Sequence, residues 1–291
     1  MAGTSDAVAE DALYVLTAAL LTPAQFPSVL GDDYPAACAT LALEPYAEGY
    51  GLVLGQDSDG ARWTVAVDDV SVVAAAIAAW DCGMEYDLSP DDRSMVCALP
   101  GWPLPVAVAA PDLPAPHNPP SGPGTGGTGP VLLAPPDTDA WGPAQRRMGA
   151  DEIAHRWAAW REQLDEERAR TSAGPADDAE APDRGDTPRG AAGAFTGDTS
   201  PVSHAGLRRA LAEAHSYLEA PPPPGRVRSS FAGGDARMLR ADGPGWSLVA
   251  RTDDVAFVLL DDEPGEVLPV GRGAALPGLL ESLEAIAVRP A

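Results

Sequence analysis

Two stretches rich in proline and glycine divide this chain and limit what each part of it can fold into. The first runs from Pro111 to Pro136 and the second from about Thr171 to Thr199. Neither has the periodicity of a helix or a strand, and neither can bury much apolar area. We therefore expect both stretches to be disordered.

The rest of the sequence predicts two folded modules. A length of 291 residues suits one or two domains, and a hydrophobic fraction of 45% is enough for packed cores. The predicted parts are an acidic module over residues 1–111, a mostly disordered linker over 112–201 with a helix at about 139–170, and a second module over 202–291. The predicted class is α+β: two small modules of antiparallel sheet with flanking helices, joined by a tether that carries one amphipathic helix.

Hydrophobic periodicity and turn residues place the elements of the first module. Apolar residues along one face predict a helix over Ala7–Leu21, and Asp59-Gly60 predicts the turn of a hairpin. The predicted strands are Tyr50–Leu54, Arg62–Val67, Ser94–Leu99 and Val106–Ala109. A helix is expected over Val70–Trp80, capped by Asp68 or Asp69.

The second module is predicted to begin and end with a helix. Ser203 is a candidate N-cap for a helix over Ser203–Glu219, with Leu207, Leu211 and Leu218 on its apolar side. The predicted strands are Ala236–Ala241, Trp246–Arg251, Val255–Leu260 and Val267–Val270. The closing helix is expected over Leu276–Ile286. This order is typical of helices on one face of an antiparallel meander.

A short pattern recurs in the two modules. Residues 59–73 and 242–258 each contain Asp-Gly, then a tryptophan (Trp63 or Trp246), an apolar run and Asp-Asp-Val. One interpretation is a duplicated module. The other is that both are ordinary hairpins, in which Asp-Gly turns are common.

The charge is strongly acidic and unevenly distributed. The formal net charge is −24, and residues 1–112 hold 17 Asp and Glu against Arg62 and Arg93. A nucleic-acid backbone or an anionic membrane surface would be repelled, so neither is an expected partner. A protein with a basic surface would be attracted, above all by the first module. Acidity that serves only solubility is the alternative.

No motif indicates a reaction, a cofactor, a metal site or a known family. The cysteines Cys38, Cys82 and Cys97 form no CxxC pair, and none of the four histidines stands in an HExxH motif. The acidic turn at residues 57–60 fails the spacing of an EF-hand calcium loop. The chain has neither a basic N-terminal region nor an apolar run long enough to span a membrane, so we expect a cytoplasmic protein.

The predicted central helix is the strongest candidate for a binding site. Its side chains Ile153, Trp157, Trp160 and Leu164 recur at i, i+4, i+7 and i+11 and form one stripe. Two tryptophans are costly to leave in water, so the stripe must be buried. It can pack on its own modules, or it can bind another protein or a second copy.

These observations favour a non-enzymatic, adaptor-, chaperone- or immunity-like protein that binds another protein through its acidic surface and the tethered helix. One alternative is an enzyme with a composite site between the modules. The other is a structural component of a larger assembly, in which the helix joins the parts. The oligomeric state is left open.

Overall fold

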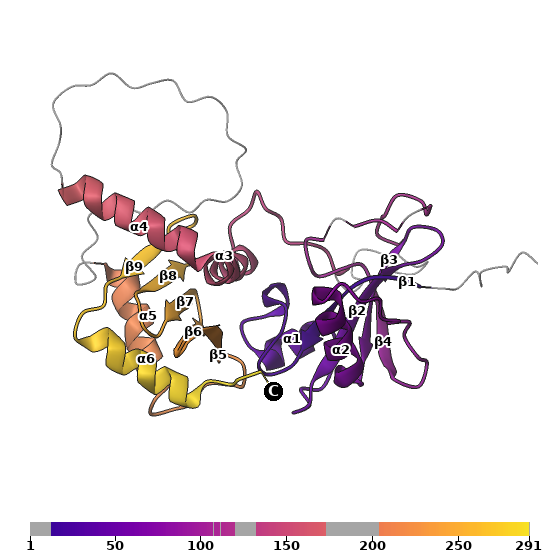
Figure 1. The fold of residues 1–291 in the computed structure, drawn as a ribbon, viewed down its shortest axis with the longest axis horizontal. Helices are drawn as coiled ribbons and strands as arrows, with labels where there is room; N and C mark the ends of the chain where they lie inside the picture. Colours follow the sequence, from indigo (N-terminus) through magenta and orange to yellow (C-terminus); the bar gives the residue numbers. More distant parts are fainter. Residues whose placement is uncertain (1–12, 107, 111, 120–131, 173–203, 291) are drawn as a thin grey trace, which may run out of the picture. The chain divides into compact units, whose positions relative to one another are not determined.

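The computed structural model describes residues 13–106, 108–110, 112–119, 132–172 and 204–290. The chain divides into two compact units, Met1–Pro136 and Asp137–Ala291 (Figure 1). Each unit contains one antiparallel sheet and several helices, so the predicted α+β class is confirmed at this level. Most of the predicted disorder, over residues 120–131 and 173–203, lies outside the described residues.

The first unit is built on a four-stranded antiparallel meander in the order β1-β2-β3-β4. The strands are β1 (Tyr14–Leu21), β2 (Tyr50–Gln56), β3 (Arg62–Val67) and β4 (Met95–Pro100). The Asp57 carboxylate builds the turn between β2 and β3, because it accepts hydrogen bonds from the backbone of Asp59 and Ala61 and from the Trp63 indole. The three predicted strands that correspond to β2, β3 and β4 are confirmed.

The prediction of a helix over Ala7–Leu21 is wrong from Tyr14 onward, where the chain forms β1, and residues 7–12 lie outside the described part. The run YVLTAALL is apolar apart from Thr17, since side chains on both faces of this sheet are covered. Such a run carries no two-residue alternation and can be mistaken for a helix. The strand predicted over Val106–Ala109 is likewise not formed at residues 106, 108 and 109.

Helices cover both faces of the first sheet. The short helix η1 (Ser28–Leu30) and α1 (Tyr34–Thr40) lie over one face, where Leu21, Tyr34 and Leu52 share a core. On the other face, α2 (Val70–Asp81) packs Val73 and Ala76 against β1 and β2, in a core that also contains Val65 and Val67 of β3. Helix α2 and its Asp69 cap match the prediction, whereas α1 was not predicted.

The described ends of the first proline- and glycine-rich stretch are bound to this sheet, contrary to the prediction of disorder there. The backbone of His117 donates to Gly60 and accepts from Arg62, both at 2.9 Å. Leu133 pairs with Gly101 in an isolated bridge. A proline-rich segment still has carbonyl oxygens that accept hydrogen bonds, and backbone groups at the ends of strands need partners. A segment of this kind can therefore bind at the end of a strand.

The bridge between Gly101 and Leu133 gives a first prediction. Gly101 has φ +87°, and a Cβ there would lie 2.0 Å from the Leu133 carbonyl oxygen. Gly83 also has positive φ, +71°, but open space around it. Gly83→Ala should cost only about 1–2 kcal/mol of backbone strain, whereas Gly101→Ala should cost at least about 1 kcal/mol more. Thermal unfolding of the two full-length variants compares them. Equal losses would show that the bridge does not form.

The second unit contains a five-stranded antiparallel meander, β5-β6-β7-β8-β9. Its strands are β5 (Val227–Gly233), β6 (Ala236–Gly243), β7 (Trp246–Arg251), β8 (Ala256–Leu260) and β9 (Leu268–Val270). Strands β6 to β9 were predicted and β5 was not. The β5 sequence VRSSFAG lacks the alternation of buried apolar and exposed polar residues that predicts a strand. The polar Ser229 is buried, whereas the apolar Phe231 is 72% exposed.

Helices α5 (Ala205–Ser216) and α6 (Ala275–Ile286) cover one face of this sheet, as predicted. The predicted N-cap Ser203 lies outside the described residues, and the structure places His204 at the cap, where its ring nitrogen accepts from the Leu207 backbone. Leu218 does not belong to the apolar side of α5, because it follows the helix end and is 39% exposed.

The opposite face is covered by the predicted central helix, which is two helices: α3 (Pro143–His155) and α4 (Trp157–Ser172). Arg156 separates them with φ −111° and ψ 36°, outside helical geometry. The predicted single helix at about 139–170 is corrected in this respect. Successive residues of β7 serve opposite faces, so that Leu248 meets α5 and α6 whereas Val249 meets α3 and α4.

The repeated pattern has different structural contexts in the two units. In both, Asp-Gly precedes a strand that contains the tryptophan. The following Asp-Asp-Val leads into helix α2 in the first unit, but forms the turn before β8 in the second. The resemblance is therefore confined to one hairpin.

Candidate functional site

The predicted stripe is buried within the second unit. Ile153 lies on α3, and Trp157, Trp160 and Leu164 lie on α4; none is more than 8% exposed. The stripe packs on the sheet face formed by Val249, Val255, Phe257, Leu259 and Val267. Phe257 meets both indoles, with ring centroids 5.2 Å from Trp157 and 6.4 Å from Trp160.

This arrangement corresponds to the intramolecular alternative that the sequence left open. The two indole rings cover the apolar face of β7 and β8 and so remove its apolar surface from water. If a partner protein were to bind the stripe, α4 would first have to leave the sheet and expose both surfaces. The stripe is therefore a structural contact in this conformation.

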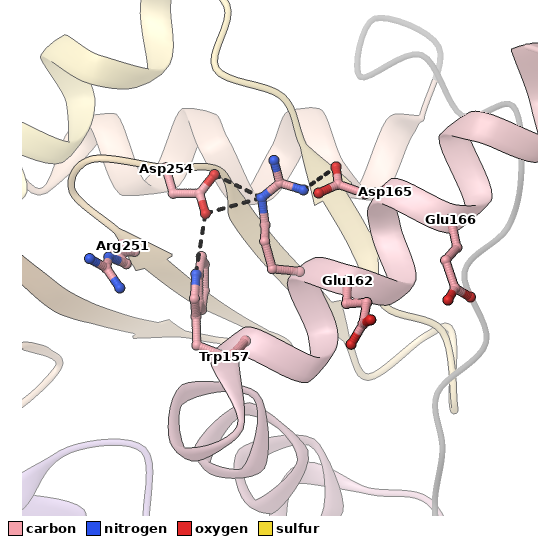
Figure 2. A pocket seen from close by; sticks show the side chains of 8 residues that line it. Trp157, Glu162, Asp165, Glu166, Arg251 and Asp254 are labelled. Carbon is pink, nitrogen blue, oxygen red and sulfur yellow. Dashed lines mark hydrogen bonds and ion pairs between the residues drawn. The ribbon is translucent and has the colours of Figure 1, made fainter.

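A charged groove of about 530 Å³ lies beside α4 (Figure 2). Arg161 bonds to both Asp254 oxygens, at 2.9 and 3.0 Å, and to Asp165. The Trp157 indole donates to Asp254 at 3.3 Å. Figure 2 shows Asp165 and Asp254 on either side of one guanidinium, with Glu162 and Glu166 pointing away from it.

Ion pairs and hydrogen bonds in this groove keep Asp254 ionised. Partial burial would raise the pKa of Asp254, but the hydrogen bonds from Arg161, the Val255 backbone and Trp157 outweigh it and lower the pKa. A carboxylate held ionised in this way is a poor general base. These contacts fasten α4 to the turn before β8, and they already engage the side chains of Arg161, Asp165 and Asp254 with one another.

A second charged cluster fastens α3 to the sheet. The Asp242 carboxylate on β6 is fully buried and accepts from Arg240, Arg228 and Ser247. Arg240 also reaches Asp151 of α3 and the Arg147 carbonyl. Burial would raise the pKa of Asp242, but the charges of Arg240 and Arg228 outweigh it and keep the pKa below the usual range.

From the α3 side, Arg146 completes the attachment. Its guanidinium is buried, forms an ion pair with Asp261 at 2.8 Å and donates to the Gly243 carbonyl. Helix α3 is therefore attached to the second unit by ion pairs, and α4 by apolar packing together with the Arg161–Asp254 pair.

Two of the three cysteines, Cys38 and Cys97, are poor nucleophiles in this structure. Burial raises the pKa of the Cys38 and Cys97 thiols, which reduces the thiolate fraction. The His204 ring contacts Glu263 on one nitrogen and caps α5 with the other. Among the residues that the structure describes, no group of three or more His, Cys, Asp and Glu side chains could hold a metal ion. Within the same ranges, no helix is both long and apolar enough to cross a membrane.

The first unit exposes a different kind of surface, which we call the acidic edge: residues 80–98, from the last turn of α2 into β4. Strand β4 ends the sheet, so one side of it has no strand partner over Met95–Leu99 among the described residues. Leu88 holds the connecting loop in the α2 core. The loop's acids are solvent-exposed, namely Asp81, Glu85, Asp87, Asp91 and Asp92.

Large apolar side chains are exposed along the same segment. They are Trp80 (37% exposed), Met84 (59%), Tyr86 (44%), Met95 (41%) and Val96 (46%). Single exposed apolar residues are ordinary, but five within 17 residues of chain are typical of an interaction surface, and Met95 and Val96 among them lie on the open strand β4. The charge excess in this module was predicted from the sequence, whereas the exposure of these apolar side chains was not. The sequence signal was the alternation Met84-Glu85-Tyr86-Asp87.

Comparison with known proteins gives no relative from which a role could be transferred. No model of a known protein family, no curated protein and no solved structure matches this chain.

Proposed function

We propose that this protein is a non-enzymatic, adaptor-like protein whose first unit binds a basic segment of another protein along the acidic edge. The observation that supports this proposal is the combination of a strand without an outer partner, exposed apolar side chains and an excess of carboxylates in one segment. The buried stripe on α4 supports partner binding less well, because it is already covered.

The proposed binding mode is strand addition to β4. An extended segment would form main-chain hydrogen bonds to the free side of β4, and its alternate side chains would face the two sides of the sheet. Trp80, Met84 and Tyr86 would provide apolar anchors, since aromatic side chains often dominate binding energy. The carboxylates would attract Arg and Lys of the partner and select against acidic competitors.

The prediction for this site concerns the pair Met84→Ser and Tyr86→Ser. Both side chains are exposed, so the double variant should keep its thermal stability and lose affinity by roughly tenfold or more. The measurement is calorimetric titration of the full-length chain with a decapeptide of alternating Arg and Val, at low and high salt. Binding should weaken as salt rises.

A matched control is Tyr46→Ser, which removes a 55% exposed tyrosine elsewhere in the first unit and should leave affinity unchanged. The corresponding Glu–Val decapeptide should bind much more weakly than the Arg–Val peptide. Salt-insensitive binding, or equal loss in the control variant, would contradict the proposal. Affinity purification from the native cell, with wild type and double variant compared, would then identify the partner.

A further inference from the structure

The second unit contains a hollow that the side chains attaching α3 and α4 to the sheet do not fill. It measures about 350 Å³ and lies between residues 138–141, α3, the start of α4 and the connection from β8 to β9. Its large apolar lining residues are Trp141, Met148, Ile153, Trp160, Leu259 and Val267. A mainly apolar pocket of this size lies at the lower end of the range for small-molecule sites.

The described charged groups that line the hollow all have the same sign. They are Asp139, Glu152 and Glu266, and no arginine from the described ranges lines the pocket. Glu152 pairs with Arg156, which lies outside the lining, whereas Asp139 and Glu266 form no ion pair in the described part of the chain. An anionic ligand would therefore be repelled and a cation attracted.

One polar group in the wall has no hydrogen-bond partner in the described part of the chain. The indole N–H of Trp141 is buried and has no acceptor among the residues that the structure describes. Buried donors without acceptors are uncommon in native proteins, because the lost hydrogen bond to water is not replaced. A hydroxyl or carbonyl group of an occupant would supply that acceptor after a small movement of the wall.

We infer that this hollow, the Trp141 pocket, binds a small molecule that has an aromatic body, one hydrogen-bond acceptor and a positive charge. The aromatic body would contact Trp160, Met148 and Leu259, and the acceptor would meet the Trp141 indole. The charge would remain near Asp139 and Glu266 at the polar part of the lining. This site is independent of the acidic edge, and it belongs to the other unit.

Three probes test the inference on the full-length, ¹⁵N-labelled chain. Tyramine has all three features, phenethylamine lacks the hydroxyl, and 4-hydroxyphenylacetate carries the opposite charge. Tyramine should shift the indole signals of Trp141 and Trp160 saturably and leave that of Trp63 unchanged. Phenethylamine should bind roughly three- to tenfold more weakly, because it offers no acceptor. The anion should bind at least about tenfold more weakly.

Two variants assign the effect to the pocket. Trp141→Phe should abolish the difference between tyramine and phenethylamine, because it removes the indole N–H that would donate to the tyramine hydroxyl. Glu266→Gln should weaken tyramine roughly threefold or more, whereas Glu281→Gln, the same change on α6 away from the lining, should not. No saturable shift with tyramine, equal binding of the anion, or equal effects of the two Glu variants would overturn the inference.

Discussion

Replacement of Asp242 by alanine is expected to lower the free energy of unfolding of the second unit by about 3–5 kcal/mol. The change removes the carboxylate that three side chains share and leaves Arg240 and Arg228 with a charge excess in the protein interior. It also weakens the attachment of α3, because Arg240 bridges Asp242 and Asp151. Hydrogen exchange of the full-length chain in increasing urea, followed by mass spectrometry of peptides from β6 and β7, measures the loss.

The matched control is Asp262→Ala. Asp262 also forms an ion pair with an arginine, Arg209 at 3.0 Å, but both side chains are more than half exposed. Exposed pairs contribute little, so this variant should lose less than about 1 kcal/mol. Equal effects of the two substitutions would contradict the buried network.

The same carboxylate gives the stability a pH dependence. The pKa of Asp242 is lower in the folded chain than the ordinary value of about 3.9, so its contribution is present above that value and is lost as the pH falls through the folded-state pKa. The stability difference between wild type and Asp242→Asn should therefore shrink as the solution is acidified below about pH 4.

The second large effect is expected from the double substitution Trp157→Ala and Trp160→Ala. It should release α4 from the sheet and cost at least about 3 kcal/mol, since each change removes a large buried aromatic side chain. Amides of α4 should lose protection against hydrogen exchange while those of β7 stay protected. The sheet keeps its second cover, α5 and α6.

Trp80→Ala serves as the control, because this indole is 37% exposed and its removal should cost little. Unchanged protection of α4 in the double variant would mean that the stripe does not hold the helix. Protection of α4 that rises with protein concentration in the wild type would mean that a second copy covers the stripe.

The sequence was most informative where local chemistry determines structure. Asp59-Gly60 located the β2–β3 turn, and Asp69 located the start of α2. It failed for β1, because an apolar run in a sheet covered on both faces lacks alternation. The spacing of Ile153, Trp157, Trp160 and Leu164 correctly indicated a buried stripe. It did not indicate the break at Arg156 or what lies under the stripe, which depend on tertiary packing.

The candidate sites were less predictable than the fold. Exposure of Met84 and Tyr86 depends on how Leu88 anchors the loop, and the composition of the segment does not reveal it. The Trp141 pocket brings together residues more than 100 positions apart, such as Trp141 and Val267. No local pattern encodes such a pair.

The cover formed by α3 and α4 has a consequence during synthesis. These helices precede in sequence the strands on which they pack, and the hydrogen bond from Arg146 to Ser247 spans 101 residues. At about 5–20 residues per second, the ribosome would need roughly 5–20 s to produce the rest of that contact. Throughout this interval Trp157 and Trp160 have no sheet to cover, so the nascent chain is an expected substrate for chaperones that bind exposed aromatic segments. The meander, whose strand pairs are all local, can form quickly once it is complete.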